Sequence, residues 1–312
     1  MRPINSRHLT NTGFASTLLA IFLAGFLSLV EAQNQPAQPP RPLIVGVAHI
    51  AFQVSDIAKA REFYGGLLGY EEPFQIQNPD GSPALTYFKV NDRQYIEIFP
   101  GLPAGQDERL RHIAFETTDI NDLRLYLKSK GVKVPDTHRQ GRDGNFNFTV
   151  NDPDNHTVEF VQYRPGSLHT KARGKYLSAQ RISDRILHVG ITVADAAAAD
   201  KFYKDILGFA ETWRGGRDDA TLNWINMKVP DGTDYIEYML TTGKPTRQQL
   251  GSSHHVALLV PDIQKALETA RQRVDDPAQI RSPQIGRNRR WQLNLFDPDG
   301  SRAELMEPFT MK

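Results

Sequence analysis

The sequence has no cysteine among its 312 residues, and its charges almost cancel, with 37 Lys and Arg against 36 Asp and Glu. The lack of cysteine excludes disulfides, iron–sulfur clusters, thiolate zinc sites, cysteine nucleophiles and a lipid-modified N-terminal cysteine. Any metal site must therefore use histidine and carboxylate ligands. A net charge of +1 gives no long-range basic field for nucleic acid. With 39% hydrophobic and 23% charged residues, the composition is typical of a folded globular protein.

The first 32 residues are interpreted as a signal peptide. Arg2 and Arg7 precede an uncharged run over residues 14–30, and the tripeptide VEA then offers small residues at the two positions that a signal peptidase reads. We therefore expect a periplasmic or secreted protein. Retention of this segment as a membrane anchor is the alternative, since the run is at the short limit for spanning a bilayer. The Pro-rich residues 33–43 are expected to form a stiff spacer.

Internal repetition divides the rest of the chain into two domains. Residues 49–70 and 188–209 share nine identities in 22 positions, and residues 111–120 match residues 254–263 in the second half of each copy. Two domains with two halves each follow from this pattern. We place the first over residues 44–163 and the second over 186–308, joined by a basic, solvent-exposed linker over residues 164–185.

One element recurs in all four halves: a histidine, six further residues, and an aspartate where a strand pattern changes to helical spacing. An aspartate at such a position caps the free backbone N–H groups of a helix, so we interpret these four as helix caps. The pairs are His49/Asp56, His112/Asp119, His188/Asp195 and His255/Asp262. Glycines at 69, 131 and 208 are expected to end three of the helices. Short alternating runs follow each helix, so the predicted unit is one strand, a helix and three strands.

Strand alternation predicts where the histidines point. In the run HIAFQV, Ile50, Phe52 and Val54 form the apolar face that covers the helix, so His49 faces the other way. The same alternation applies to the other three histidines. Two glutamates in each copy have mostly apolar neighbours and also point away from the core; they are Glu97, Glu159, Glu237 and Glu304.

These motifs resemble the vicinal oxygen chelate superfamily, which includes glyoxalase I, bleomycin resistance proteins and extradiol dioxygenases. The resemblance implies an α+β fold with tandem domains, each built from two paired βαβββ modules whose curved mixed sheet forms a cup with helices outside. Members of this superfamily place metal ligands on the first, fourth, fifth and eighth strands of each cup. The matching positions are His49, Glu97, His112 and Glu159 in the first domain and His188, Glu237, His255 and Glu304 in the second.

Such ligands favour a divalent nickel, zinc, manganese, cobalt or iron(II) ion, some of whose coordination positions are not occupied by the protein. No organic cofactor is expected. The implied partner is a small substrate with vicinal oxygens, which chelates the ion while charge grows on those oxygens. Glu159 or Glu304 would shuttle a proton in a glyoxalase-like lyase or isomerase. An iron(II) extradiol-type dioxygenase is one alternative. A non-catalytic, drug-binding protein with a pocket lined by Tyr87, Trp213 and Trp224 is another.

Further side chains are assigned from parity and position. Arg290, Gln292 and Asn294 are expected to face the second cup and bind an acidic or polar substrate. His254 points to the opposite side of its strand from His255 and is expected at the surface. The remaining loop histidines, His138, His156 and His169, are expected to be solvated. The sequence leaves open the oligomeric state and whether one or both cups are active.

Overall fold

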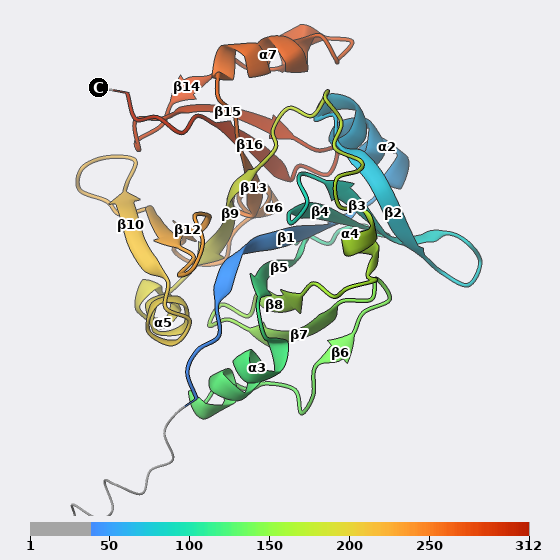
Figure 1. The fold of residues 1–312 in the computed structure, drawn as a ribbon. Helices are drawn as coiled ribbons and strands as arrows, with labels where there is room; N and C mark the ends of the chain where they lie inside the picture. Colours follow the sequence, from blue (N-terminus) through green and yellow to red (C-terminus); the bar gives the residue numbers. More distant parts are fainter. Residues whose placement is uncertain (1–38, 312) are drawn as a thin grey trace, which may run out of the picture. The chain divides into compact units, whose positions relative to one another are not determined.

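Residues 39–311 are described by a computed structural model (Figure 1). The predicted signal peptide over residues 1–32, and residues 33–38 of the predicted spacer, lie outside this range. Between residues 39 and 311, none of the helices has both the length and the apolar character required to cross a membrane.

The first domain contains an eight-stranded mixed sheet in the order β2-β3-β4-β1-β5-β8-β7-β6. Its central strands are β4, β1, β5 and β8, in which β1 runs parallel to β4 and antiparallel to β5, and β5 runs parallel to β8. The strands are β1 (Ile44–Val54), β2 (Glu71–Gln77), β3 (Pro83–Lys89), β4 (Tyr95–Pro100), β5 (Leu110–Thr117), β6 (Arg139–Gln140), β7 (Phe146–Asn151) and β8 (Thr157–Gln162).

The second domain repeats this sheet in the order β10-β11-β12-β9-β13-β16-β15-β14. Its strands are β9 (Ile186–Val193), β10 (Ala210–Gly215), β11 (Trp224–Lys228), β12 (Tyr235–Leu240), β13 (His255–Leu259), β14 (Gln284–Ile285), β15 (Trp291–Phe296) and β16 (Arg302–Met306). The two curved sheets and their order of elements confirm the predicted α+β fold with tandem βαβββ modules.

Each module places its main helix directly after its first strand. These helices are α2 (Ile57–Arg61), α3 (Ile120–Ser129), α5 (Ala196–Asp200) and α7 (Ile263–Arg271). The four predicted caps are confirmed, because the carboxylate of each aspartate accepts hydrogen bonds from backbone N–H groups of the first turn. Gly69, Gly131 and Gly208 have positive φ angles of 77°, 80° and 83°, as expected where a helix ends in a left-handed residue.

Two π-helices, which alternation and spacing do not predict, extend the first helix of each domain. They are η1 (Glu62–Leu67) and η2 (Lys201–Ile206). Each carries a buried aromatic pair, and the second residue of each pair is the tyrosine that contacts the other domain. Each π-helix therefore contributes one hydrogen bond, from its tyrosine, to the contact between the domains.

The two domains share one continuous apolar core and two equivalent hydrogen bonds. The Tyr64 hydroxyl donates to Asp297 Oδ2 at 3.1 Å, and the Tyr203 hydroxyl donates to Asp152 Oδ2 at 2.9 Å. Burial first, and the nearby Asp297, raise the pKa of Tyr64, so this hydroxyl keeps its proton and remains a donor. Buried residues of both domains belong to a single hydrophobic cluster, in which Phe115 packs edge-on against Phe209.

The linker packs against the first domain. It contains α4 (Leu168–Lys171), and Lys89 Nζ, which is fully buried, donates to the carbonyl oxygen of Lys175 at 2.8 Å. Asp92 accepts from the same ammonium at 2.7 Å. A buried ammonium requires such partners, so these contacts hold the linker at a fixed place on the domain.

We expect Tyr64→Phe to lower the free energy of unfolding by about 1–2 kcal/mol, because the buried Asp297 carboxylate loses a donor. Tyr203→Phe should have the same effect through Asp152. Urea denaturation followed by circular dichroism measures both changes. Tyr176→Phe is the control, since this ring is 44% exposed. Equal stabilities of Tyr64→Phe and Tyr176→Phe would contradict the role of the interdomain hydrogen bond.

Candidate metal centres

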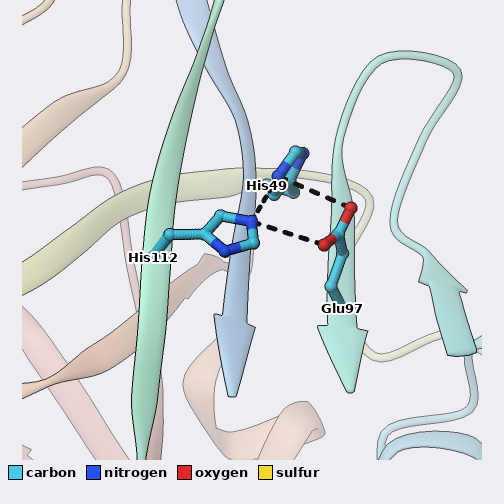
Figure 2. A group of neighbouring side chains, drawn as sticks. All are labelled: His49, Glu97 and His112. Carbon is cyan, nitrogen blue, oxygen red and sulfur yellow. Dashed lines mark hydrogen bonds and ion pairs between the residues drawn. The ribbon is translucent and has the colours of Figure 1, made fainter. Parts of the chain in front are cut away.

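Four predicted side chains converge in the first domain, at the site called cup 1, which consists of His49, Glu97, His112 and Glu159. The Nε2 atoms of His49 and His112 lie 2.9 Å apart. Glu97 Oε1 lies 3.5 Å from His49 Nε2, and its Oε2 lies 3.4 Å from His112 Nε2. Figure 2 shows the Glu97 carboxylate facing the two imidazoles. Glu159 Oε2 lies 3.7 Å from His49 Nε2 and 3.2 Å from His112 Nε2.

The register of the four central strands explains this convergence. Glu97 on β4 and His112 on β5 are both paired with Ala51 of β1, and His49 of β1 and Glu159 of β8 are both paired with Ala114 of β5. Since alternate residues share a face, the four donors and two alanines lie on the same side of the sheet. The small alanine side chains leave the space into which the donors point.

Burial gives the two carboxyl groups of cup 1 different pKa values. Burial, partly offset by His49 and reinforced by Glu159, raises the pKa of Glu97 to about 8. Burial would also raise the pKa of Glu159, but the neighbouring imidazoles of His49 and His112 lower it. Burial lowers the pKa of His112, which keeps one ring nitrogen unprotonated and available as a ligand at neutral pH.

The donor set of cup 1 fits a divalent cation. Two imidazole nitrogens and two carboxylates, all largely shielded from water, face one another at the distances given above. The lone pairs of nitrogen and oxygen atoms that face one another in a buried site repel unless a proton or a cation lies between them. Imidazole nitrogen and carboxylate oxygen together are ligands for zinc, nickel, manganese, cobalt or iron(II).

The equivalent site in the second domain, cup 2, consists of His188, Glu237, His255 and Glu304. The Nε2 atoms of His188 and His255 lie 3.0 Å apart, and the nearest carboxylate oxygen, Glu304 Oε2, lies 3.4 Å from His188 Nε2. The structure therefore brings together both predicted sets of four. A guanidinium group also lies among the donors of cup 2, since Arg302 Nη2 is 2.9 Å and 3.0 Å from the two ring nitrogens of His255.

Arg302 changes the electrostatics of cup 2. Burial first, and then the Arg302 charge, lower the pKa of His255 to about 3. Burial would raise the pKa of Glu304, but the charge of Arg302 and the neighbouring imidazoles of His188 and His255 bring it well below its usual value. A positive charge supplied by the chain thus already stabilises the ionised carboxylate of this site.

The two cups differ in size and lining. The cavity of cup 1 measures about 530 Å³ and includes Tyr87, whereas that of cup 2 measures about 290 Å³ and includes Trp213 and Trp224. Gln292 and Asn294 line cup 2 as predicted. Arg290 does not line it, because this residue lies in the turn before β15, where strand alternation no longer applies. The arginines that line cup 2 are Arg287 and Arg302.

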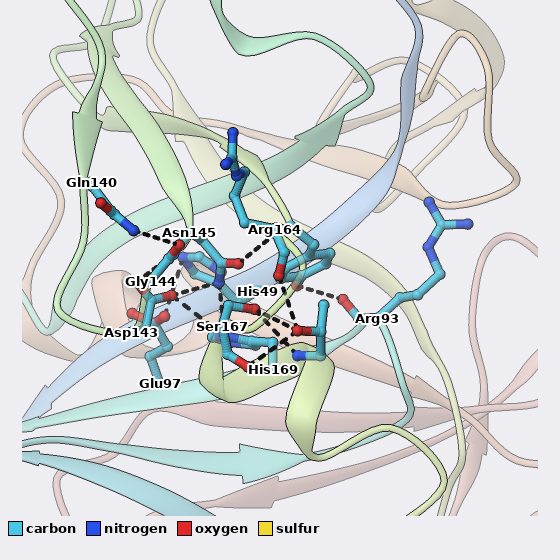
Figure 3. Close-up of polar contacts among 12 residues, drawn as sticks. His49, Arg93, Glu97, Gln140, Asp143, Gly144, Asn145, Arg164, Ser167 and His169 are labelled. Carbon is cyan, nitrogen blue, oxygen red and sulfur yellow. Dashed lines mark hydrogen bonds and ion pairs between the residues drawn. The ribbon is translucent and has the colours of Figure 1, made fainter.

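His169 lines cup 1, although its position in the linker predicted a solvated side chain. Ser167 caps α4, and the Leu168 N–H donates to the Asp143 carbonyl oxygen at 2.8 Å, which holds this helix against the cup. Figure 3 shows His169 beside Asp143 and Asn145. His169 Nδ1 lies 2.8 Å from Asn145 Nδ2 and 3.3 Å from Asp143 Oδ2, whereas its buried Nε2 has no hydrogen-bond partner among residues 39–311. Only tertiary packing reveals this residue, because no local motif marks it.

The expectations for His254 and His156 are also wrong. His254 is only 2% exposed; its Nδ1 lies 2.9 Å from Glu108 Oε1 and its Nε2 lies 2.9 Å from Thr192 Oγ1. The same hydroxyl oxygen lies 3.1 Å from Nε2 of the half-buried His156. Alternation correctly turns His254 away from the cup, but the face opposite the cup is covered by the other domain. His138 is half-buried and packs against Phe146.

The comparison with protein families gives matches over both domains. The sequence model of the Glyoxalase/Bleomycin resistance protein/Dioxygenase superfamily matches residues 46–160 and 185–305. A biphenyl-2,3-diol 1,2-dioxygenase from Sphingomonas paucimobilis is 35% identical over 102 residues, which are 30% of this chain and 33% of that protein. Glyoxalase I from Saccharomyces cerevisiae is 22% identical over 187 residues, 58% of this chain and 51% of that enzyme. The chain thus matches about a third to a half of these relatives' lengths.

Among solved structures, homoprotocatechuate 2,3-dioxygenase from Brevibacterium fuscum in complex with 3,4-dihydroxyphenylacetate has the same fold. Its TM-score is 0.63 at 22% sequence identity, with 87% of this chain and 82% of that chain covered.

Binding of a divalent cation to cup 1 should tighten as the pH rises. Below its raised pKa of about 8, Glu97 holds a proton that a bound cation has to displace. The apparent affinity of cup 1 for the cation should therefore increase as the pH rises towards about 8, and then level off. Calorimetric titration with Mn²⁺ at about pH 6 and about pH 8 measures the difference and the released protons. The same titration of Glu97→Gln should lose most of this pH dependence. An affinity in the wild type that is the same at both pH values contradicts the expectation.

Proposed function

The chain belongs to the Glyoxalase/Bleomycin resistance protein/Dioxygenase superfamily, and from this premise we propose that it is an exported, metal-dependent enzyme that acts in cup 1 on a small substrate with vicinal oxygens. The observation that carries the proposal is the convergence of His49, Glu97, His112 and Glu159 in a cavity of about 530 Å³. This volume suits a small molecule. Export rests on the sequence of residues 1–32.

The four side chains of cup 1 would hold a nickel, zinc, manganese, cobalt or iron(II) ion. Such an ion, when bound, supplies a Lewis acid that stabilises negative charge on two adjacent substrate oxygens. Four protein ligands favour glyoxalase-like lyase or isomerase chemistry, in which a proton moves between neighbouring carbons and no oxidant is needed. Glu159 remains the predicted proton shuttle, and Glu97, whose pKa is raised, is a second carboxyl group able to hold a proton near neutral pH.

His169 and Asp143 add a proton-transfer group at the wall of the same cavity. Asp143 and Asn145 fix one ring nitrogen, and Nε2, which has no hydrogen-bond partner among residues 39–311, would be the atom that exchanges a proton with a bound substrate. Burial lowers the pKa of His169, and the hydrogen bond and charge of Asp143 partly offset this. The ring is therefore neutral near pH 7, as an imidazole that gives or takes a proton requires.

The rim of cup 1 favours an anionic substrate. Three arginines line the cavity: Arg111, Arg139 and Arg142. The Arg111 guanidinium lies 4.8 Å from the centre of the Phe99 ring, and Arg142 Nη1 donates to the Gln77 carbonyl oxygen at 2.9 Å. Guanidinium groups bind carboxylate or phosphate through paired hydrogen bonds, so a substrate carrying such a group is favoured.

Extradiol-type cleavage of a catechol is the second candidate function. The observation in its favour is the relationship to a dioxygenase that is 35% identical over 102 residues. In such a reaction His49, His112 and Glu159 would form the two-histidine, one-carboxylate triad suited to iron(II). Glu97 stands against it, because a fourth protein ligand takes a position that dioxygen needs. A drug-binding function without a metal is a third possibility, and metal content separates it from both.

Metal dependence tests the proposed function. Removal of bound metal with a chelator, or His49→Ala, should abolish activity, because the donor set of cup 1 loses its cation or a ligand. Assays with a hemithioacetal and with a catechol under air distinguish the two chemistries by isomer formation and by oxygen uptake. His138→Ala is the control, since this histidine lies outside the cup 1 cavity. A protein that binds no divalent metal after reconstitution would overturn both candidate reactions.

His169→Gln should lower kcat by about 10²–10⁴-fold while leaving KM and the bound metal almost unchanged, because the amide cannot exchange a proton. The pH profile of kcat should also lose the limb that belongs to the imidazole. Elemental analysis checks that the metal is retained, and His138→Gln serves as the matched control. Full activity with an unaltered pH profile in His169→Gln would remove His169 from the mechanism.

A further inference from the structure

The two cups have the same four donors but differ at the position two residues before the last ligand. Alignment of the two DPD turns pairs Thr157 of β8 with Arg302 of β16. Alternation along a strand puts Arg302 on the same face as Glu304, just as it puts Thr157 on the same face as Glu159. Thr157 and Arg302 each line the cavity of their own cup. A neutral hydroxyl in one cup therefore corresponds to a permanent positive charge in the other.

Arg302 reaches the donor atoms that a metal would need. Its Nη2 lies 3.0 Å from His255 Nε2, and its Nη1 lies 3.8 Å from Glu304 Oε1 and 3.4 Å from Asn294 Oδ1. His255 Nδ1 lies 2.8 Å from the Ser253 carbonyl oxygen, which can only accept, so Nδ1 carries the proton. The lone pair of the ring is thus on Nε2. Arg302 Nη2 lies 2.9 Å from Nδ1 and 3.0 Å from Nε2, and of these two nitrogens only Nε2 can accept a hydrogen bond from the guanidinium.

A second difference buries His255 more deeply than its counterpart. Ala51 in the first domain is replaced by Gly190 in the second, and each is the strand partner of the cup histidine on the neighbouring strand. A Cβ atom at Gly190 would lie 2.0 Å from His255 Cε1 and 2.1 Å from its Nδ1. The imidazole of His255 therefore takes the space that a methyl group fills in cup 1. Its side chain is fully buried, whereas that of His112 is 12% exposed.

From these observations, and resting on the proposed metal site in cup 1, we infer that Arg302 serves as the built-in cation of cup 2, which consequently binds no divalent metal. The chain then holds one metal ion, in cup 1, and a metal-free second cup. A divalent ion in cup 2 would meet a guanidinium at close range in a water-poor site. It would also have to displace the hydrogen bond on His255 Nε2. Affinity for the ion should fall by on the order of 100-fold or more relative to cup 1.

Metal stoichiometry of the full chain tests this inference with exchanges between the matched positions. After stripping and reloading with Mn²⁺, equilibrium dialysis with elemental analysis should give about one equivalent in the wild type. Arg302→Thr should give about two, because cup 2 then has the side chain of cup 1. Thr157→Arg should give about none, because cup 1 then has the guanidinium of cup 2. The double variant Gly190→Ala/Arg302→Thr should restore cup 2 most fully, since the methyl group moves His255 into the cup.

The outcomes separate this inference from the proposed function. Two equivalents in the wild type would overturn the role of Arg302 and leave the metal site of cup 1 intact. One equivalent in both Arg302→Thr and Gly190→Ala/Arg302→Thr would do the same. No metal in the wild type or in either of these variants would overturn the proposed function itself. Arg302→Met, which removes the charge but keeps an apolar stem of similar length, provides a second measurement if Arg302→Thr does not fold. Near-ultraviolet circular dichroism verifies the packing of each variant.

Discussion

Four lone-pair donors buried in one hollow require a positive charge among them, and this electrostatic constraint governs both halves of the molecule. In each domain two imidazoles approach to about 3 Å and two carboxylates lie within 4 Å of them, largely away from water. Water cannot screen these groups, so a proton, a metal ion or a cationic side chain must do so. In the first domain burial raises the pKa of Glu97 to about 8, and in the second the Arg302 guanidinium lies among the donors.

The duplicated domains thus share one scaffold but differ in the group that balances the charge of the buried donors. The strand register that brings the donors together is equivalent in both sheets, since Ala51 and Gly190 occupy the same place between their ligand strands. What differs is the surrounding shell. In the first domain, α4 brings His169 to the cavity wall; in the second, Arg302 reaches the donors and the cavity is about half the size. Fold and ligand pattern alone therefore do not determine the electrostatics of each cup.

The sequence predicted the scaffold well because its signals are local and repeated. Alternation placed His49 and His188 on the cup face, and the change from strand to helix spacing identified Asp56 and its three counterparts as caps. Even the grouping of the eight donors followed from family positions and strand order. These features depend on residues close in sequence or on a register that the repeat itself reveals.

The failures share a physical cause, which is packing between distant segments. His169 lies in a linker whose composition predicted a solvated surface, yet its contact with Asp143 brings it into cup 1. His254 faces away from its cup as alternation requires, but Glu108 of the first domain covers it. Arg290 was placed by extending alternation into a turn, while Arg302, one strand further on, reached the cup. Alternation gives the face of a strand but not which element covers that face.

An anomalous diffraction map of the Mn²⁺-loaded crystal tests the central claim most directly, because it locates each bound ion. The account predicts one peak, in cup 1, bonded to His49 Nε2, His112 Nε2 and the carboxylates of Glu97 and Glu159 at roughly 2.0–2.3 Å. It predicts no peak beside Arg302. A peak of equal height in cup 2, or none in cup 1, would contradict it.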